Sequence, residues 1–151
     1  MTTAHLAGDL RIDEGLRLKA YPDPLTGGAP WTIGYGHTGP EVHRGLVWNL
    51  NQAEAALAAD IAHAEALCDA HIPWWRGLAD ARQDVLVNMM FNMGWLSPDH
   101  AHGLGTFVHT LQAMHEGRYD AAAAGMLNSG WAHQVHDRAQ RLAHQMATGV
   151  R

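Results

Sequence analysis

The sequence predicts a mainly helical α+β protein with a single domain, and three observations support this prediction. Residues 16–38 combine extended stretches with glycine- and proline-rich turns, which indicates a small β region. Residues 49–72 form an alanine-rich run without helix breakers, and a proline ends it. The rest of the chain is rich in apolar segments with helical spacing. We therefore expect an N-terminal lobe over about residues 1–48, a connecting helix over about 49–72 and a helical C-terminal lobe over about 73–151.

The first element is predicted to be a helix that ends near Glu14. Thr2 or Thr3 is suited to cap its start, because a hydroxyl can accept a backbone N–H bond there. Gly15 directly after it is a typical stop signal. The apolar residues expected to form its buried stripe are Leu6, Leu10 and Ile12.

The β region is predicted to hold two extended stretches joined by a loop. Residues 18–21 and 31–35 are the extended stretches, and the run Pro-Asp-Pro-Leu-Thr-Gly-Gly-Ala-Pro between them indicates a turn or loop. Residues 38–48 show no clear periodicity and are expected to be loop.

The helices that follow are predicted from apolar periodicity and capping residues. Asn49 is the expected N-cap of the connecting helix, which at about 1.5 Å per residue would span about 30 Å. The densely apolar run at 81–96 is expected to lie at the centre of the core. Further helices are predicted over 103–115, 120–127 and 138–148.

Composition excludes several classes of function. The 151 residues carry 10 basic and 15 acidic side chains, and a net charge of −5 makes nucleic acid an unsuitable partner. Cys68 is the only cysteine, so no internal disulfide is possible. The N-terminus lacks the pattern of a signal peptide, and no run of about 18 apolar residues occurs. We expect a protein made in a reducing cytoplasm, without stable membrane insertion.

Two carboxylates suggest acid/base chemistry. Glu14 ends the first predicted helix, and Asp23 lies nine residues later in a turn-prone segment. Cleavage of an acetal needs one group that protonates the leaving oxygen and another that activates water. The negative end of the helix dipole favours the protonated form of Glu14, so we expect Glu14 to be the acid and Asp23 the base. The plainer alternative is a solvated helix end and a turn-forming aspartate.

The run LRIDEGLRLKAY, followed by an aspartate and then TIGYGH, resembles the opening of the T-even bacteriophage lysozymes, the phage-type muramidases of glycoside hydrolase family 24. This resemblance implies a lysozyme-like two-lobe fold and assigns catalytic roles to Glu14, Asp23 and Thr32. It also implies inversion at the anomeric carbon, for which the carboxyl groups lie about 6.5–9.5 Å apart. Asp23 and Thr32 are three residues further apart than is usual, which we expect to enlarge the hairpin tip. Thr26 is a less favoured rival for Thr32.

The resemblance continues through the chain. It implies that His37 forms a structural pair with Asp60 rather than acting as a base. In the C-terminal lobe, LVNMMFNMG resembles the family's central buried helix and SGWAHQVHDRAQR resembles another family segment. By position, Arg138 would pair with the catalytic glutamate. The residues that would bind or support the substrate are Gln134, Arg138, Asn92 and Phe107.

The implied function is hydrolysis of the β-1,4 bond between N-acetylmuramic acid and N-acetylglucosamine in peptidoglycan. A phage endolysin of this kind is a monomer without cofactor that stays in the host cytoplasm until a holin gives it access to the wall. Protonation of the 12 histidines would change the net charge from −5 to +7, so wall affinity is expected to rise at low pH.

Two other functions are compatible with parts of the sequence. A zinc-dependent peptidoglycan amidase or peptidase is suggested by the pairs His100/His102 and His133/His136, although neither pair has a convincing set of further ligands and we expect no metal. A wall-binding lysozyme homologue without activity is the other alternative.

Overall fold

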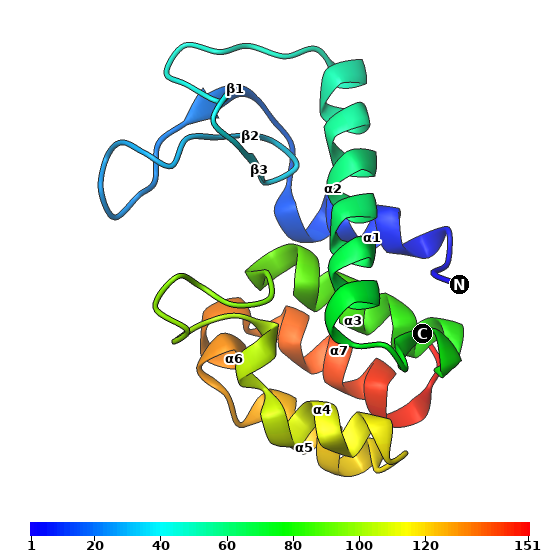
Figure 1. The fold of residues 1–151 in the computed structure, drawn as a ribbon. Helices are drawn as coiled ribbons and strands as arrows, with labels where there is room; N and C mark the ends of the chain where they lie inside the picture. Colours follow the sequence, from blue (N-terminus) through cyan, green and yellow to red (C-terminus); the bar gives the residue numbers. More distant parts are fainter. The chain divides into compact units, whose positions relative to one another are not determined.

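The computed structural model describes residues 1–151 and confirms the mainly helical α+β class (Figure 1). Helices make up most of the ordered elements, and a single three-stranded antiparallel sheet completes them. The chain divides into two compact units, which we call the N-terminal unit, Ala4–His63, and the C-terminal unit, Ala64–Arg151 together with Met1–Thr3.

Helix α1, His5–Glu14, opens the N-terminal unit. Gly15 ends it with φ 71°, and its N–H donates to the carbonyl of Arg11 over 3.0 Å. The predicted threonine cap is wrong, because the N-cap is Ala4 and no side chain caps the helix. Thr3 instead directs its N–H and its hydroxyl to Asp84 within the C-terminal unit, where the carboxylate is buried and needs donors.

The apolar stripe of α1 is narrower than predicted. Leu6 and Leu10 are buried, as expected for residues four apart on one helix face. Ile12 is 80% exposed, so its predicted burial is wrong. Two residues beyond Leu10, its side chain lies about 200° further around the helix, on the opposite face.

The sheet consists of β1, Arg17–Tyr21, β2, Thr32–Gly34, and β3, His37–Thr38, in that spatial order. The loop predicted at 38–48 returns along the outer edge of β1. The N–H of Trp48 donates to the carbonyl of Leu18 over 2.8 Å, and the N–H of Ala20 donates to that of Leu46 over 2.9 Å. This pairing satisfies an edge that would otherwise expose its backbone polar groups. The core under the sheet contains Ala20, Ile33 and Val42 with Trp31, Leu46 and Trp48 packed against them.

Helix α2, Leu50–His71, belongs to both units and has 22 residues. Its start confirms Asn49 as the N-cap. The Asn49 side chain accepts the N–H of Gln52, and the Gln52 side chain accepts the N–H of Asn49, both over 2.9 Å. This reciprocal pair is a capping box, which satisfies two backbone donors that the helix itself leaves without partners.

The C-terminal unit is built around α3, Asp80–Met93, in which residues 83–90 are all buried. The central position predicted for this run is therefore confirmed. Helix α7 packs against α3, α5 and α6, and α4 packs against α5 (Figure 1). The bounds of the other elements are η1 Trp75–Gly77, η2 Leu104–Thr106, α4 Val108–His115, α5 Tyr119–Leu127, α6 Gly130–Val135 and α7 Asp137–Thr148.

The single helix predicted over 103–115 is wrong at its start. The structure has a 3-10 turn, then Phe107 outside both elements, and only then α4. Gly103 adopts φ 111°, and a Cβ on it would lie 2.3 Å from the carbonyl oxygen of Trp95. Gly103 therefore lies outside the helix, and Phe107, with φ −82° and ψ 51°, separates the 3-10 turn from α4. None of the helices combines the length and the apolar character that crossing a membrane requires.

Candidate functional site

The carboxylate of Glu14 lies against the turn between β2 and β3. A Cβ atom placed on Gly36 would lie 2.6 Å from Oε2 of Glu14 and 3.1 Å from its carboxyl carbon. Gly36 also has φ 72°, a conformation that other residues rarely adopt. Glycine at this position therefore leaves the space that the carboxylate occupies.

The last turn of α1 and the β2–β3 turn are both tied to α2 through Glu54. The guanidinium of Arg11 donates to both carboxylate oxygens of Glu54 over 2.7–3.2 Å, and the hydroxyl of Tyr35 donates to Oε1 over 2.9 Å. The bonds from Arg11 and then Tyr35 lower the pKa of Glu54. The pKa of Tyr35 is raised, mainly by burial and further by the bond to Glu54. Glu54 is thus an ionised acceptor that two elements share.

Asp23 is the second residue of the loop that follows β1. Its carboxylate accepts the N–H of Leu25 over 2.7 Å, its own N–H donates to the carbonyl of Gly28 over 2.9 Å, and its carbonyl accepts the N–H of Gly27 over 2.8 Å. An aspartate that bonds the backbone two residues ahead forms an Asx turn, which holds its carboxylate at one orientation. The loop sequence itself therefore positions this side chain.

Thr32 occupies the central strand of the sheet. It lies opposite Tyr21 of β1 and opposite Thr38 of β3, so it is fixed on both sides. Residues 22–31 connect β1 to β2, and the extra residues between Asp23 and Thr32 therefore lie in the hairpin loop. Thr26 is exposed in this loop, where its hydroxyl donates to the carbonyl of Ala29 over 3.0 Å.

His37 lies between two carboxylates within the N-terminal unit. Nδ1 is 2.7 Å from Oδ2 of Asp60, and Nε2 is 2.6 Å from Oε1 of Glu41. Burial of the ring opposes its protonation, but the bonds to Glu41 and Asp60 outweigh burial, so the net effect raises the pKa of His37. Both ring nitrogens are engaged by carboxylates, an arrangement suited to holding the imidazole in place.

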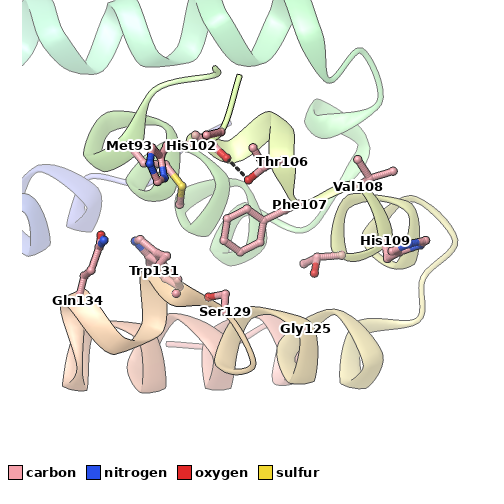
Figure 2. Close-up of a pocket in the computed structure, with 14 residues that line it drawn as sticks. Met93, His102, Thr106, Phe107, Val108, His109, Gly125, Ser129, Trp131 and Gln134 are labelled. Carbon is pink, nitrogen blue, oxygen red and sulfur yellow. Dashed lines mark hydrogen bonds between the residues drawn. The ribbon is translucent and has the colours of Figure 1, made fainter. Parts of the chain in front are cut away.

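The C-terminal unit contains a pocket of about 530 Å³ lined by Phe107, Trp131 and Gln134 (Figure 2). The ring of Trp131 meets the ring of Phe107 edge-on, with centroids 6.2 Å apart and planes at 82°. Its indole N–H donates to the Asn92 side chain over 2.7 Å. Ser129 caps α6 by accepting the N–H of Ala132 over 3.1 Å. The pocket thus combines aromatic walls with an amide at its rim, a composition typical of small-molecule sites.

Arg138 lies at the start of α7, within hydrogen-bond distance of α3. Its Nε and Nη2 donate to Oδ1 of Asn88 over 3.0 and 2.8 Å. Because Asn88 is buried, this contact restrains the guanidinium of Arg138, whose long side chain would otherwise be flexible.

The predicted site residues fall into one group in each unit. Glu14, Asp23, Thr32, His37 and Asp60 belong to the N-terminal unit. The C-terminal unit contains those predicted to bind or support the substrate: Asn92, Phe107, Gln134 and Arg138.

Sequence reasoning missed Arg11, Tyr35, Glu41 and Glu54. One available signal was Tyr35 itself, an aromatic residue between two glycines whose hydroxyl needs a partner if the ring is buried. Within residues 1–151 no group of three or more His, Cys, Asp and Glu side chains is arranged to hold a metal ion.

Comparison with known proteins gives a family match and several relatives, of which two are described below. Residues 11–146 match the family model described as phage lysozyme. The chain is 31% identical over 168 residues to the pre-baseplate central spike protein Gp5 of Enterobacteria phage T4, covering 95% of this chain but only 28% of that protein. It is 26% identical over 166 residues to the probable T4-type lysozyme 1 of Dictyostelium discoideum, covering 93% of this chain and 92% of that protein.

Proposed function

Because the chain belongs to the phage lysozyme family of glycoside hydrolases, we propose that it is a muramidase that cuts peptidoglycan. The bond cleaved is the β-1,4 linkage between N-acetylmuramic acid and N-acetylglucosamine. Glu14 is the general acid, Asp23 the general base and Thr32 the residue that positions the attacking water.

One observation carries this proposal: Glu14, Asp23 and Thr32 come from three consecutive segments of the same compact unit, a helix end, a loop and a strand. Glu14 ends α1, Asp23 follows β1, and Thr32 opens β2. Each is held by its surroundings, Glu14 against Gly36, Asp23 in its Asx turn and Thr32 between two strands. Groups that are already held in place can act on a substrate without a further loss of conformational entropy.

The proposed reaction is an inverting displacement. Protonated Glu14 gives its proton to the glycosidic oxygen as the bond from that oxygen to the anomeric carbon breaks. A water molecule held by the Thr32 hydroxyl attacks the opposite face of the same carbon and loses its proton to the Asp23 carboxylate. The products are two shorter glycan chains, one with a new reducing end, while Glu14 is left ionised and Asp23 protonated.

The C-terminal unit is proposed to bind the glycan. Phe107 and Gln134 line its 530 Å³ pocket, and Asn92 orients the Trp131 ring that forms one wall. Apolar sugar faces pack on aromatic rings, while an amide can bond the ring substituents. Arg138 is proposed to support the acid.

The biological setting we propose is that of an endolysin, in which a holin gives the enzyme access to the host wall. Co-expression with a holin in a bacterial host should lyse the culture, and expression of the enzyme alone should not. Lysis by the enzyme alone would show that it reaches the wall without a holin.

Release of reducing sugar from purified peptidoglycan tests the reaction. Wild type should release reducing ends, with and without EDTA. Glu14→Gln and Asp23→Asn should reduce release at least 100-fold while remaining folded, because general acid and base catalysis each contribute about 10²–10⁴-fold. Asp120→Asn, an exposed carboxylate on α5, is the matched control and should keep wild-type activity.

Other outcomes would identify the alternatives. Clearing of the suspension without reducing ends, abolished by EDTA, would indicate a zinc amidase or peptidase. Binding to the wall without clearing or reducing ends would indicate a non-catalytic homologue. The anomeric configuration of the first product, read by proton NMR, tests inversion, since a β product would require retention.

A further inference from the structure

We propose that Glu54 is a positioning residue for Glu14 and acts through Arg11 and Tyr35. The inference rests on the proposed function, because it concerns the side chain assigned there as the general acid. Glu54 lies on α2, and its side chain bonds Arg11 and Tyr35, neither of which is a proposed catalytic residue.

The first contact of Glu54, with Arg11, fixes the end of α1. Arg11 lies three residues before Glu14, in the last turn of the helix. Its guanidinium makes a bidentate bond to Glu54, with the shortest distance 2.7 Å. A bidentate pair restrains orientation as well as distance, so it limits rotation of the turn that presents Glu14.

The second contact of Glu54, with Tyr35, fixes the β2–β3 turn. Tyr35 stands between Gly34 and Gly36, both of which have positive φ, 67° and 72°. A turn with two such glycines gains no stiffness from its own backbone, since glycine adopts several conformations readily. The buried Tyr35 ring and its 2.9 Å hydroxyl bond to Glu54 supply that restraint.

Both contacts bear on the position of the Glu14 carboxylate. That carboxylate lies against Gly36, the residue directly after Tyr35, and closely enough that a Cβ there would be 2.6 Å away. Glu54 therefore restrains both partners of this contact, the helix end that carries Glu14 and the turn on which it lies. Loss of the contact with Arg11 or of the contact with Tyr35 should let Glu14 move relative to the Asx turn that holds Asp23 and the strand that holds Thr32.

The test compares Tyr35→Phe and Glu54→Gln with a control that loses the same kind of contact elsewhere. Asp69 receives a bidentate bond from Arg76, over 2.7 and 3.0 Å, and an aromatic N–H bond from Trp75 over 2.8 Å. Asp69→Asn thus removes a carboxylate that likewise accepts from one arginine and one aromatic side chain, in the C-terminal unit and outside the proposed site. The assay measures kcat and KM on soluble peptidoglycan fragments, the pH profile of kcat, and Tm.

Tyr35→Phe and Glu54→Gln should lower kcat by about 10- to 100-fold with KM within about twofold, because small displacements of a catalytic group cost this much. The pH profile of kcat should also shift in both variants, since the surroundings of the acid change. Asp69→Asn should keep the wild-type kcat and profile despite a similar loss of Tm. Tyr35→Phe keeps the ring and its packing, so it reports on the hydroxyl even if Glu54→Gln folds poorly.

The failures of the two proposals are distinguishable. Wild type that releases no reducing ends overturns the proposed function. Active wild type with unchanged kcat in Tyr35→Phe overturns the positioning role alone. Equal loss of kcat in Asp69→Asn also overturns it, because the loss would then follow stability.

Discussion

The carboxylate of Glu14 lies so close to the backbone of Gly36 that a methyl group on this residue would collide with it. The sequence shows a glycine alternating with other residues in TIGYGH, a pattern common to many strands and turns. The identity of the group that comes close is a property of the folded chain. Here it is the side chain that we propose as the general acid.

Gly36→Ala should therefore abolish most activity and destabilise the protein. A positive φ costs a non-glycine residue about 1–2 kcal/mol, and the added Cβ would displace Glu14 in addition. Gly45→Ala is the matched control, because Gly45 has φ 87° but nothing within 4 Å of its Cβ position. Both variants should lose stability by chemical denaturation, Gly36→Ala at least as much as Gly45→Ala, and only Gly36→Ala should lose reducing-sugar release. Similar activity in both would show that the contact with Glu14 is unimportant.

His37 should make stability depend on pH. Its pKa is raised in the folded protein, so the folded state holds the proton more tightly than the unfolded state. Its stabilising contribution is therefore fully present below the ordinary histidine range, about 6.5, and is lost as pH rises through the raised value. Glu41 acts in the opposite sense: the bond to His37 lowers the pKa of Glu41, so its contribution is lost on acidification.

Measurement of Tm from pH 5 to 9 checks this prediction. The fall in Tm across the raised histidine pKa should disappear in His37→Asn, with a loss near pH 6 of about 1.5–3 kcal/mol for a hydrogen bond to a charged group. His43→Asn, an exposed histidine of the same unit, should keep the wild-type pH dependence. Persistence of the full slope in His37→Asn would assign it to other groups.

At the scale of elements, α2 is the helix whose local sequence is most consistent with its structure. Its alanine-rich run favours helix, its start has a capping box, and Pro73 follows its end. The same helix carries Glu54 and Asp60, which bond Arg11, Tyr35 and His37 of the N-terminal unit. The proposed site therefore depends on correct formation of this helix, although α2 contributes no proposed catalytic residue.

Asn49→Ala should lower the free energy of unfolding by about 1 kcal/mol, the usual cost of losing an N-cap. Gln52→Ala should have a smaller effect, and the double variant should lose less than the sum, because the two bonds belong to one capping box. Asn51→Ala on the exposed face of the same turn should be neutral or slightly stabilising. Full additivity in urea denaturation would show that the two bonds act independently.

At the scale of the molecule, charge is the property that bears most on an anionic substrate. Every histidine except His37 is exposed, so protonation changes the charge of the surface and not only of the interior. Full protonation of the 12 histidines would move the net charge from −5 to +7. Attraction to a negatively charged wall should therefore rise on mild acidification and weaken with added salt.

Binding of Glu14→Gln to purified peptidoglycan measures this without degrading the wall. The bound fraction should rise several-fold between pH 8 and pH 5.5 at low salt, and the rise should be smaller at about 0.5 M salt. A binding curve that is flat with pH would show that the histidines do not set wall affinity.

The sequence alone determined the elements and the candidate acids, because those depend on local pattern. Helical spacing predicted α2, α3, α5 and α7, and extended runs bounded by turn residues predicted β1 and β2. Local pattern failed where distant contacts decide. Thr3 bonds the buried Asp84 in place of capping α1. Gly103 lies close to the backbone of Trp95 in a conformation that is not helical, and the helix predicted from residue 103 starts only at Val108.

Only the tertiary structure decided what holds the candidate acid. Arg11, Tyr35 and Glu54 come from a helix end, a turn and a second helix, and lie up to 43 residues apart in the sequence, so no spacing rule joins these side chains before the chain folds. The sequence supplied the residue types that can form a bidentate ion pair and a buried hydroxyl bond. The packing of α1 and the β2–β3 turn against α2 brought them together, and with them Glu14 onto Gly36.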